Sequence, residues 1–258
     1  SEKLLNKLDH QKIKGLENID PRFLNQSFDK NNAYSIPYLW RRLGITYNDE
    51  KVKTPPEHWQ DLWSPDYKNN LMLIDGAREI IGLALNEQGD SVNSKDMGQL
   101  NKAYNHLKSL TPNVKAIVAD EIKQYMINNE AAAAVTFSGE ASEMVSENKH
   151  LHYVVPNEGS NLWFDNIVIP KTAKNYDAAY AFINYMLRPE IAAKNAEYVG
   201  YATPNMKAEA ILPKEITSDK SFYPDATAMK NLEVYQNLGP EYLGIYNDLF
   251  LEFKMYRK

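Results

Sequence analysis

The chain has 258 residues, 43% of them hydrophobic and 24% charged, with a formal net charge of −5, a composition that excludes a disordered chain. It holds no run of apolar residues as long as a membrane-spanning helix needs, and its acidic balance argues against a nucleic-acid partner. The absence of cysteine excludes disulfides, thiolate catalysis and cysteine metal sites.

Strand-like apolar runs alternate with helical patterns along the chain, after short amphipathic pieces in the first thirty residues. This alternation predicts an α/β fold with largely parallel sheets. The expected strands are residues 34–40, 43–47, 71–74, 131–137, 153–156 and 161–170. One short helix is expected to open at residues 54–57, and further helices are expected to cover 77–85, 176–187, 189–199 and 239–257. The chain opens without an initiator methionine or an apolar leader, as the inner part of a longer protein would.

The stretch from Asn161 to Pro170 is the most informative part of the sequence. Its β-branched residues predict a strand, which Pro170 ends. Because side chains alternate along a strand, Trp163 and Asp165 share one face and Phe164 takes the other. An aromatic ring beside a carboxylate suits an organic cation, which the ring attracts and the carboxylate hydrogen-bonds. The alternative is a core tryptophan beside an aspartate that caps a turn.

Two carboxylates and three aromatic residues are further candidates. Asp75 and Glu79 follow a predicted strand, at the edge of the sheet where α/β proteins bind ligands; a helix cap and first-turn charge are their alternative roles. Phe137 ends another strand, with core packing as its alternative. Tyr201 and Tyr235 are isolated aromatic residues in turn-like contexts.

Signatures of catalysis are absent from the sequence. There is no nucleophile elbow, P-loop or dinucleotide-binding fingerprint. His150 and His152 could share a strand face but lack an evident acidic partner, so we interpret them as a solvent-facing pair. Arg41 and Arg42 are interpreted as a solvated basic doublet. The tryptophans expected in the core are Trp40, Trp59 and Trp63.

Several stretches, read together, carry a resemblance to one family. They are residues 35–40, 61–68, 75–79, 162–165, 200–205 and 223–226. In order and spacing they resemble the polyamine-binding receptors of bacterial ABC importers, the spermidine/putrescine-binding proteins. The resemblance extends over the whole chain.

The resemblance implies a type II periplasmic-binding-protein architecture, in which crossover strands join two α/β lobes and the ligand lies in the cleft. Lobe I would comprise residues 1–42 and 164–209, and lobe II residues 43–163 and 210–258. The family has no enzymatic activity, cofactor or metal. Its members bind a polyamine in the periplasm, or at the outer face of the cell membrane, and deliver it to a membrane permease.

The resemblance also implies roles for individual residues. Trp163 and Phe137 would stack on the polyamine, and Asp165 and Glu79 would each hold an amino group. Tyr201 would line the same aromatic box.

Two further residues complete the implied site. Tyr235 or its neighbour Gln236 would hydrogen-bond one end of the ligand. Some members carry aspartate at the position of Gly76, so Asp75 could bind ligand only after a shift of the turn. The preference between spermidine and putrescine depends on cleft length, which the sequence does not give.

The chain departs from the family pattern in two respects. The resemblance begins partway into the first lobe, so we expect weaker ligand binding and self-association through an exposed sheet edge. Arg41 and Arg42 stand where the family usually has glycine and a small residue. A receptor for another small organic cation, or for an organic anion, is one alternative. A lyase or hydrolase with Asp165 and Glu79 as acid and base is the other.

Overall fold

The computed structural model describes residues 4–220, 222–224 and 228–256. Backbone proximity divides the chain into two compact units. Unit 1 is Ser1–Arg41 with Trp163–Tyr223, and unit 2 is Arg42–Leu162 with Pro224–Lys258. The end of the family-like stretch at 223–226, and the last residue of the helix expected at 239–257, lie outside the described residues.

The sheet of unit 2 is mixed, which corrects the expectation of a largely parallel one. Strand β2 runs parallel to both β3 and β4, whereas β1 runs antiparallel to β4 and β5. The strand order is β3-β2-β4-β1-β6-β7, with β6 parallel to β7 and β5 added beside β1. The strands are β1 (Ser35–Asn48), β2 (Leu71–Ile74), β3 (Val114–Val118), β4 (Ala133–Phe137), β5 (Leu151–Val154), β6 (Ser160–Val168) and β7 (Leu232–Val234).

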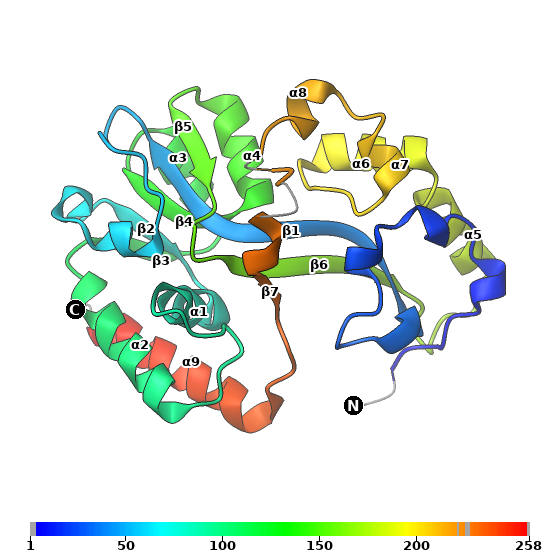
Figure 1. Ribbon diagram of the computed structural model, residues 1–258, viewed down its shortest axis with the longest axis horizontal. Helices are drawn as coiled ribbons and strands as arrows, with labels where there is room; N and C mark the ends of the chain where they lie inside the picture. The colour runs from blue at the N-terminus through cyan, green and yellow to red at the C-terminus, as the bar shows by residue number, and fades with distance from the viewer. Residues whose placement is uncertain (1–3, 221, 225–227, 257–258) are drawn as a thin grey trace. The chain divides into compact units, whose positions relative to one another are not determined.

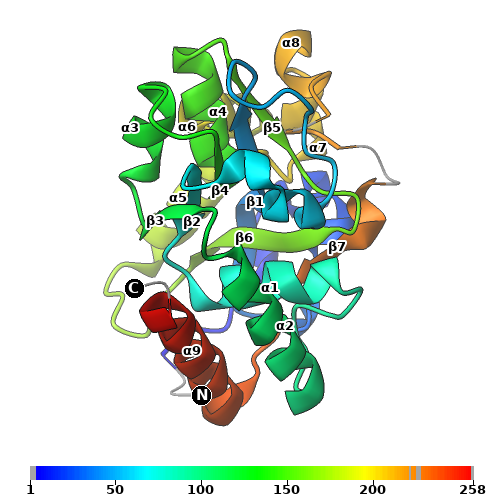
Figure 2. The ribbon, with the colours of Figure 1, turned by 90° about the vertical axis from the view of Figure 1, so that its left-hand side faces the viewer.

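Helices cover both faces of this sheet (Figure 1). Helices α1 (Ala77–Glu87), α2 (Met97–Leu110) and α9 (Gly239–Tyr256) pack against one another on one face, as Figure 2 also shows. On the other face, α3 (Ile122–Ile127) and α4 (Ser138–Glu147) contact β4. The buried side chains between these layers, among them the fully buried Trp59, form the core of unit 2. Unit 2 also contains the 3₁₀ helices Trp59–Trp63, Pro65–Tyr67 and Ala228–Asn231.

Unit 1 holds the N-terminal part of β1 and most of β6. An aromatic stack forms part of its interior: the Phe23 ring lies 5.3 Å from Trp40 and meets Phe164 edge-on at 5.6 Å. Its α-helices are α5 (Tyr176–Met186), α6 (Pro189–Val199), α7 (Met206–Glu209) and α8 (Lys214–Thr217). Its 3₁₀ helices are His10–Lys12, Leu16–Asn18, Pro21–Phe23 and Lys30–Asn32.

Backbone proximity places residues 210–223 in unit 1, whereas the lobe division expected from the sequence has them in lobe II. The buried Tyr223 holds this segment there, because its ring meets Trp40 edge-on at 6.4 Å and its hydroxyl accepts from the Thr203 amide at 3.4 Å. The remaining boundaries differ from the expected ones by a single residue.

Two local expectations also need correction. The two strand pieces at 34–40 and 43–47 are one continuous strand, β1. The helix expected to open at 54–57 is a 3₁₀ helix that begins at Trp59. Its start is set by a capping box, in which the Asp61 carboxylate accepts from the His58 amide at 2.9 Å.

The arginine doublet is not a solvated pair, since Arg42 is only 1% exposed. Its carbonyl accepts a hydrogen bond from the Tyr153 hydroxyl at 2.8 Å, and its amide donates to Ser138 Oγ at 3.3 Å. A side chain at Gly44 would collide with the Tyr153 hydroxyl and the Val154 carbonyl, so glycine is required there. Strand alternation thus separates two adjacent arginines into different surroundings.

The histidine pair does have an acidic partner, contrary to expectation. Asp49 accepts from His150 Nδ1 at 2.9 Å and from His152 Nε2 at 2.8 Å. These hydrogen bonds, the one from His152 first, lower the pKa of Asp49 below its usual 3.8. Asp49 immediately follows β1, and both histidines lie on or next to β5, which pairs with β1. The contact depends on the register of this pairing, which the sequence alone does not give.

Candidate ligand-binding residues

Strand β6 presents Trp163 and Phe164 to different surroundings, as its alternation predicts. The Phe164 ring lies 5.6 Å from Phe23 and 6.2 Å from Phe28, inside an apolar cluster. The Trp163 ring instead faces a cation, because the guanidinium carbon of Arg41 lies 5.7 Å from its centroid. The Trp163 side of the strand is therefore the one that contacts a cationic side chain within unit 1.

Tyr201 belongs to the same cluster. The Arg41 guanidinium carbon lies 5.0 Å from the Tyr201 ring centroid, and Nη1 donates to the Tyr201 hydroxyl at 2.6 Å. Gly200 positions this tyrosine by ending α6 in the left-handed conformation, with φ 75°. The next residue, Ala202, accepts from the Trp40 amide at 3.0 Å, which ties the segment to β1. We call Trp163, Tyr201 and Arg41 the Arg41 cluster.

Asp165 lies on the same strand as Trp163, near Tyr38. Burial, followed by the negative charge of Asp165, raises the pKa of Tyr38 above its usual 10. The Tyr38 hydroxyl donates to Asn195 Oδ1 at 3.2 Å, which fixes the ring. The aspartate is half-buried. Unit 1 thus contains Trp163, Tyr201 and Asp165, three of the residues to which the resemblance gives a role in ligand binding.

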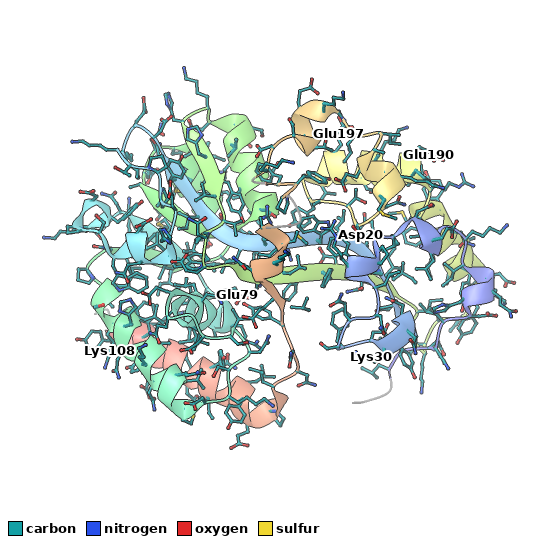
Figure 3. All side chains as sticks on the ribbon, in the orientation of Figure 1. Asp20, Lys30, Glu79, Lys108, Glu190 and Glu197 are labelled. Carbon is teal, nitrogen blue, oxygen red and sulfur yellow. The ribbon has the colours of Figure 1, made fainter. Side chains whose placement is uncertain are left out.

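In unit 2, Glu79 lies in the first turn of α1 (Figure 3). Its carboxylate folds back over Gly76, the N-cap residue, so closely that a Cβ there would collide with Oε2. The half-buried Tyr235 lies close to this carboxylate: desolvation of its hydroxyl, and then the charge of Glu79, raise the pKa of Tyr235 well above 10. Both side chains line one narrow cavity together with Asn161.

Arg78 is a residue of this region that sequence reasoning missed. Its guanidinium carbon lies 4.3 Å from the Tyr235 ring centroid and 5.0 Å from that of Tyr246. Its nitrogens donate hydrogen bonds to three oxygen atoms: the Val92 carbonyl at 3.1 Å, Asn93 Oδ1 at 2.9 Å and the Gln236 carbonyl at 3.4 Å. Arg78 therefore holds the segment that carries Tyr235 against α1. Its place beside Glu79 is the signal that could have found it.

Three other predicted residues have different surroundings. Asp75 forms an ion pair with Lys254 of α9, at 2.9 Å. Phe137 is buried in the core of unit 2, just before α4. Gln236 is anchored through its backbone amide, which donates to Asn93 Oδ1 at 2.8 Å. The structure thus brings Glu79 and Tyr235 together in unit 2, and Trp163 and Tyr201 together in unit 1.

A hollow of about 880 Å³ in unit 1 contains none of the predicted ligand residues. The lining residues are Leu4, Leu5, Asn6, Lys7, Phe28, Asp29, Tyr34, Ser35, Asn166, Val168 and Lys171. The hollow has aromatic and acidic side chains of its own, Phe28, Tyr34 and Asp29, but none of the residues that the resemblance implies for the ligand lines it.

The fold, a mixed α/β sheet covered by helices, is that of type II periplasmic binding proteins, and solved structures match it closely. A spermidine/putrescine ABC transporter substrate-binding protein from Streptococcus pneumoniae is 61% identical, with a TM-score of 0.96. The match covers 100% of this chain and 80% of that one. A putative spermidine/putrescine ABC transporter protein from Listeria monocytogenes is 58% identical, with a TM-score of 0.91, over 99% of this chain and 79% of its own.

Sequence comparison gives the family. The chain belongs to the bacterial extracellular solute-binding protein family, whose model matches residues 1–224. The spermidine/putrescine-binding periplasmic protein of Escherichia coli K12 is 38% identical over 254 residues, which are 98% of this chain and 73% of that protein. Within the described part of the chain, no helix has both the length and the apolar character to cross a membrane.

Proposed function

We propose that this protein is the extracytoplasmic receptor of an ABC importer, that its ligand is a polyamine of the spermidine and putrescine class, and that it catalyses no reaction. The observation that carries the ligand class is the Arg41 cluster: Trp163 and Tyr201 are placed so that their rings lie against a cationic group, as the guanidinium of Arg41 shows. The relatives named for spermidine and putrescine support the same ligand class.

The residues of each unit have distinct tasks in this proposal. In unit 1, Trp163 and Tyr201 contact the methylenes and one ammonium group of the ligand, and Asp165 accepts its hydrogen bonds. A carboxylate that pairs with an ammonium forms stronger hydrogen bonds than a neutral acceptor would. In unit 2, Glu79 neutralises a second ammonium group, beside the Tyr235 hydroxyl.

Three of the expected ligand residues have weaker support. Gln236 follows Tyr235 and would contact the end of the ligand. Phe137 is buried in the core of unit 2, so its role in ligand binding would be to shape the neighbouring surface. Asp75 would have to leave Lys254 to reach a ligand, which makes it the weakest candidate.

The proposed membrane partner and compartment follow from the role of a receptor in an ABC importer. A receptor of this kind delivers its ligand to the permease of the importer, a step that takes place outside the cytoplasm. The relatives are named as periplasmic proteins. We therefore propose a periplasmic location, or the outer face of the cell membrane, and a permease as partner.

Isothermal titration calorimetry with spermidine and putrescine tests the proposal. Asp165→Asn should weaken polyamine binding at least tenfold, about 1.4 kcal/mol, because the amide retains the shape but not the charge. Asp177→Asn, at an exposed carboxylate on α5 of the same unit, is the matched control and should bind like the wild type. A folded wild-type protein that binds neither polyamine would disprove the function. Tighter binding of basic amino acids or of thiamine-like cations would favour a receptor for another organic cation.

A further inference from the structure

The aromatic rings assigned to the ligand already hold a cation that belongs to the chain itself. The guanidinium carbon of Arg41 lies 5.0 Å from the Tyr201 centroid and 5.7 Å from the Trp163 centroid. Both distances are within the roughly 6 Å over which a ring attracts a cation. The hydrogen bond from Nη1 to the Tyr201 hydroxyl, at 2.6 Å, fixes the orientation of the guanidinium. Arg41 thus makes the contacts that an incoming ammonium group would need.

The backbone favours this arrangement before any ligand arrives. Arg41 lies on β1 and Trp163 on the neighbouring β6, and Tyr201 immediately precedes the residue that hydrogen-bonds to Trp40 on β1. The guanidinium is therefore delivered to the rings by adjacent strands, at a high effective concentration. A free ligand has to displace it, or bind beside it against the repulsion between like charges.

We propose that Arg41 is a tethered competitor that occupies the cation position on Trp163 and Tyr201 and lowers the affinity of the receptor for polyamines. This inference rests on the proposed function. The arginine leaves the two rings when a polyamine binds, and its removal makes the position available without that step. Arg41 is then a residue that sets affinity and specificity, although it makes no favourable contact with the ligand.

The first test compares two arginines of unit 1 by calorimetry. Arg41→Gln should bind spermidine about tenfold more tightly than the wild type, which corresponds to about 1.4 kcal/mol. Arg188→Gln is the matched control: it removes the same charge from the same unit and from a similar contact, 5.5 Å above the Tyr185 ring. The control should change the affinity by less than about twofold, because any long-range loss of charge repulsion is screened by salt. Thermal melts verify that both variants are folded.

A second test replaces the missing side chain by a soluble probe. In Arg41→Gly, about 20 mM guanidinium chloride should weaken spermidine binding relative to equal sodium chloride, since a free guanidinium can enter the vacated position. In the wild type the two salts should act alike. Equal effects of both salts on the glycine variant would overturn the idea that the position accepts a guanidinium.

A third measurement does not depend on any polyamine. In the ligand-free protein, ring currents of Trp163 and Tyr201 should shift the Arg41 side-chain proton resonances upfield, and Trp163→Leu should reduce the shift. Random-coil resonances for Arg41 would overturn the inference. So would a wild type that binds spermidine while Arg41→Gln binds it no better, a result that leaves the proposed function intact. If wild type and variants all fail to bind polyamines, both the function and the competitor role fail.

Discussion

Each unit contains an arginine over a tyrosine ring, yet the two arginines donate hydrogen bonds to different kinds of acceptor. In unit 2, Arg78 lies above Tyr235 and donates hydrogen bonds to three oxygens from two other segments. In unit 1, Arg41 lies above Trp163 and Tyr201, and its hydrogen bond at 2.6 Å ends on the ring-bearing Tyr201 itself. Arg78 joins segments of the fold through backbone carbonyls, whereas Arg41 joins β1 to Trp163 and Tyr201 through two aromatic rings and a phenol.

The difference shows that an aromatic contact alone does not reveal what an arginine does. Hydrogen bonds to the carbonyls of other segments, such as those of Arg78, tie a guanidinium into the fold, so that its removal costs stability. A guanidinium that lies over two ring faces, as that of Arg41 does, occupies a position that also attracts other cations. Substitutions that separate stability from binding therefore test the comparison.

The largest expected effect is the loss of stability in unit 2 when Arg78 is removed. Arg78→Met should lower the free energy of unfolding by about 2–4 kcal/mol, because acceptors on Val92, Asn93 and Gln236 lose a charged donor. Arg41→Met should cost less than about 1 kcal/mol, as a partly exposed contact does. Urea denaturation followed by circular dichroism measures both. Equal losses in the two variants would abolish the distinction between the arginines.

The next largest expected effect is a loss of polyamine affinity that leaves the stability of the protein unchanged. Glu79→Gln should weaken spermidine binding about tenfold or more, because the amide cannot neutralise an ammonium group. Its unfolding midpoint should stay close to that of the wild type, since the glutamine retains the shape of the first turn of α1. Glu147→Gln, at the exposed end of α4 in the same unit, is the control. If calorimetry gives both variants the affinity of the wild type, Glu79 is not a ligand residue.

The smallest effect is a dependence on alkaline pH that originates in unit 2. Because the folded pKa of Tyr235 lies well above 10, its neutral phenol stabilises the fold below pH about 10, and the contribution is lost as the pH rises through the folded pKa. The wild type should therefore lose stability more steeply above pH about 10 than Tyr235→Phe does. Urea melts at a series of alkaline pH values measure the slope. Equal slopes would show that Tyr235 ionises alike in the folded and unfolded chain.

Much of the fold could be predicted from local patterns. Helices α5, α6 and α9, and strand β2, begin within one residue of the predicted positions, because apolar periodicity and a proline at the start of α6 determine them locally. The mixed sheet could not be predicted. Strand direction depends on which distant segments pair, and the antiparallel partners of β1 lie about ninety or more residues away along the chain.

The candidate site likewise has features that local sequence patterns predict and contacts that they do not. Strand alternation predicts the separation of Trp163 from Phe164, and the ring contacts confirm it. The contact of Arg41 with Tyr201 joins residues 160 positions apart, and no periodic pattern encodes such a distance. For the same reason the burial of Arg42 was missed: a charged doublet resembles a surface feature until the neighbouring strands are known.

The folded-back carboxylate of Glu79 has a consequence for how this receptor can evolve. A Cβ at Gly76 would collide with Glu79 Oε2, so an aspartate at position 76 and the present side-chain conformation of Glu79 exclude each other. A second carboxylate at this turn therefore requires two coordinated changes, the new aspartate and a new orientation of the glutamate. Because Oε2 is the far end of a flexible side chain, a single Gly76→Asp substitution can bring about both changes and would move the Glu79 carboxylate away from its present position.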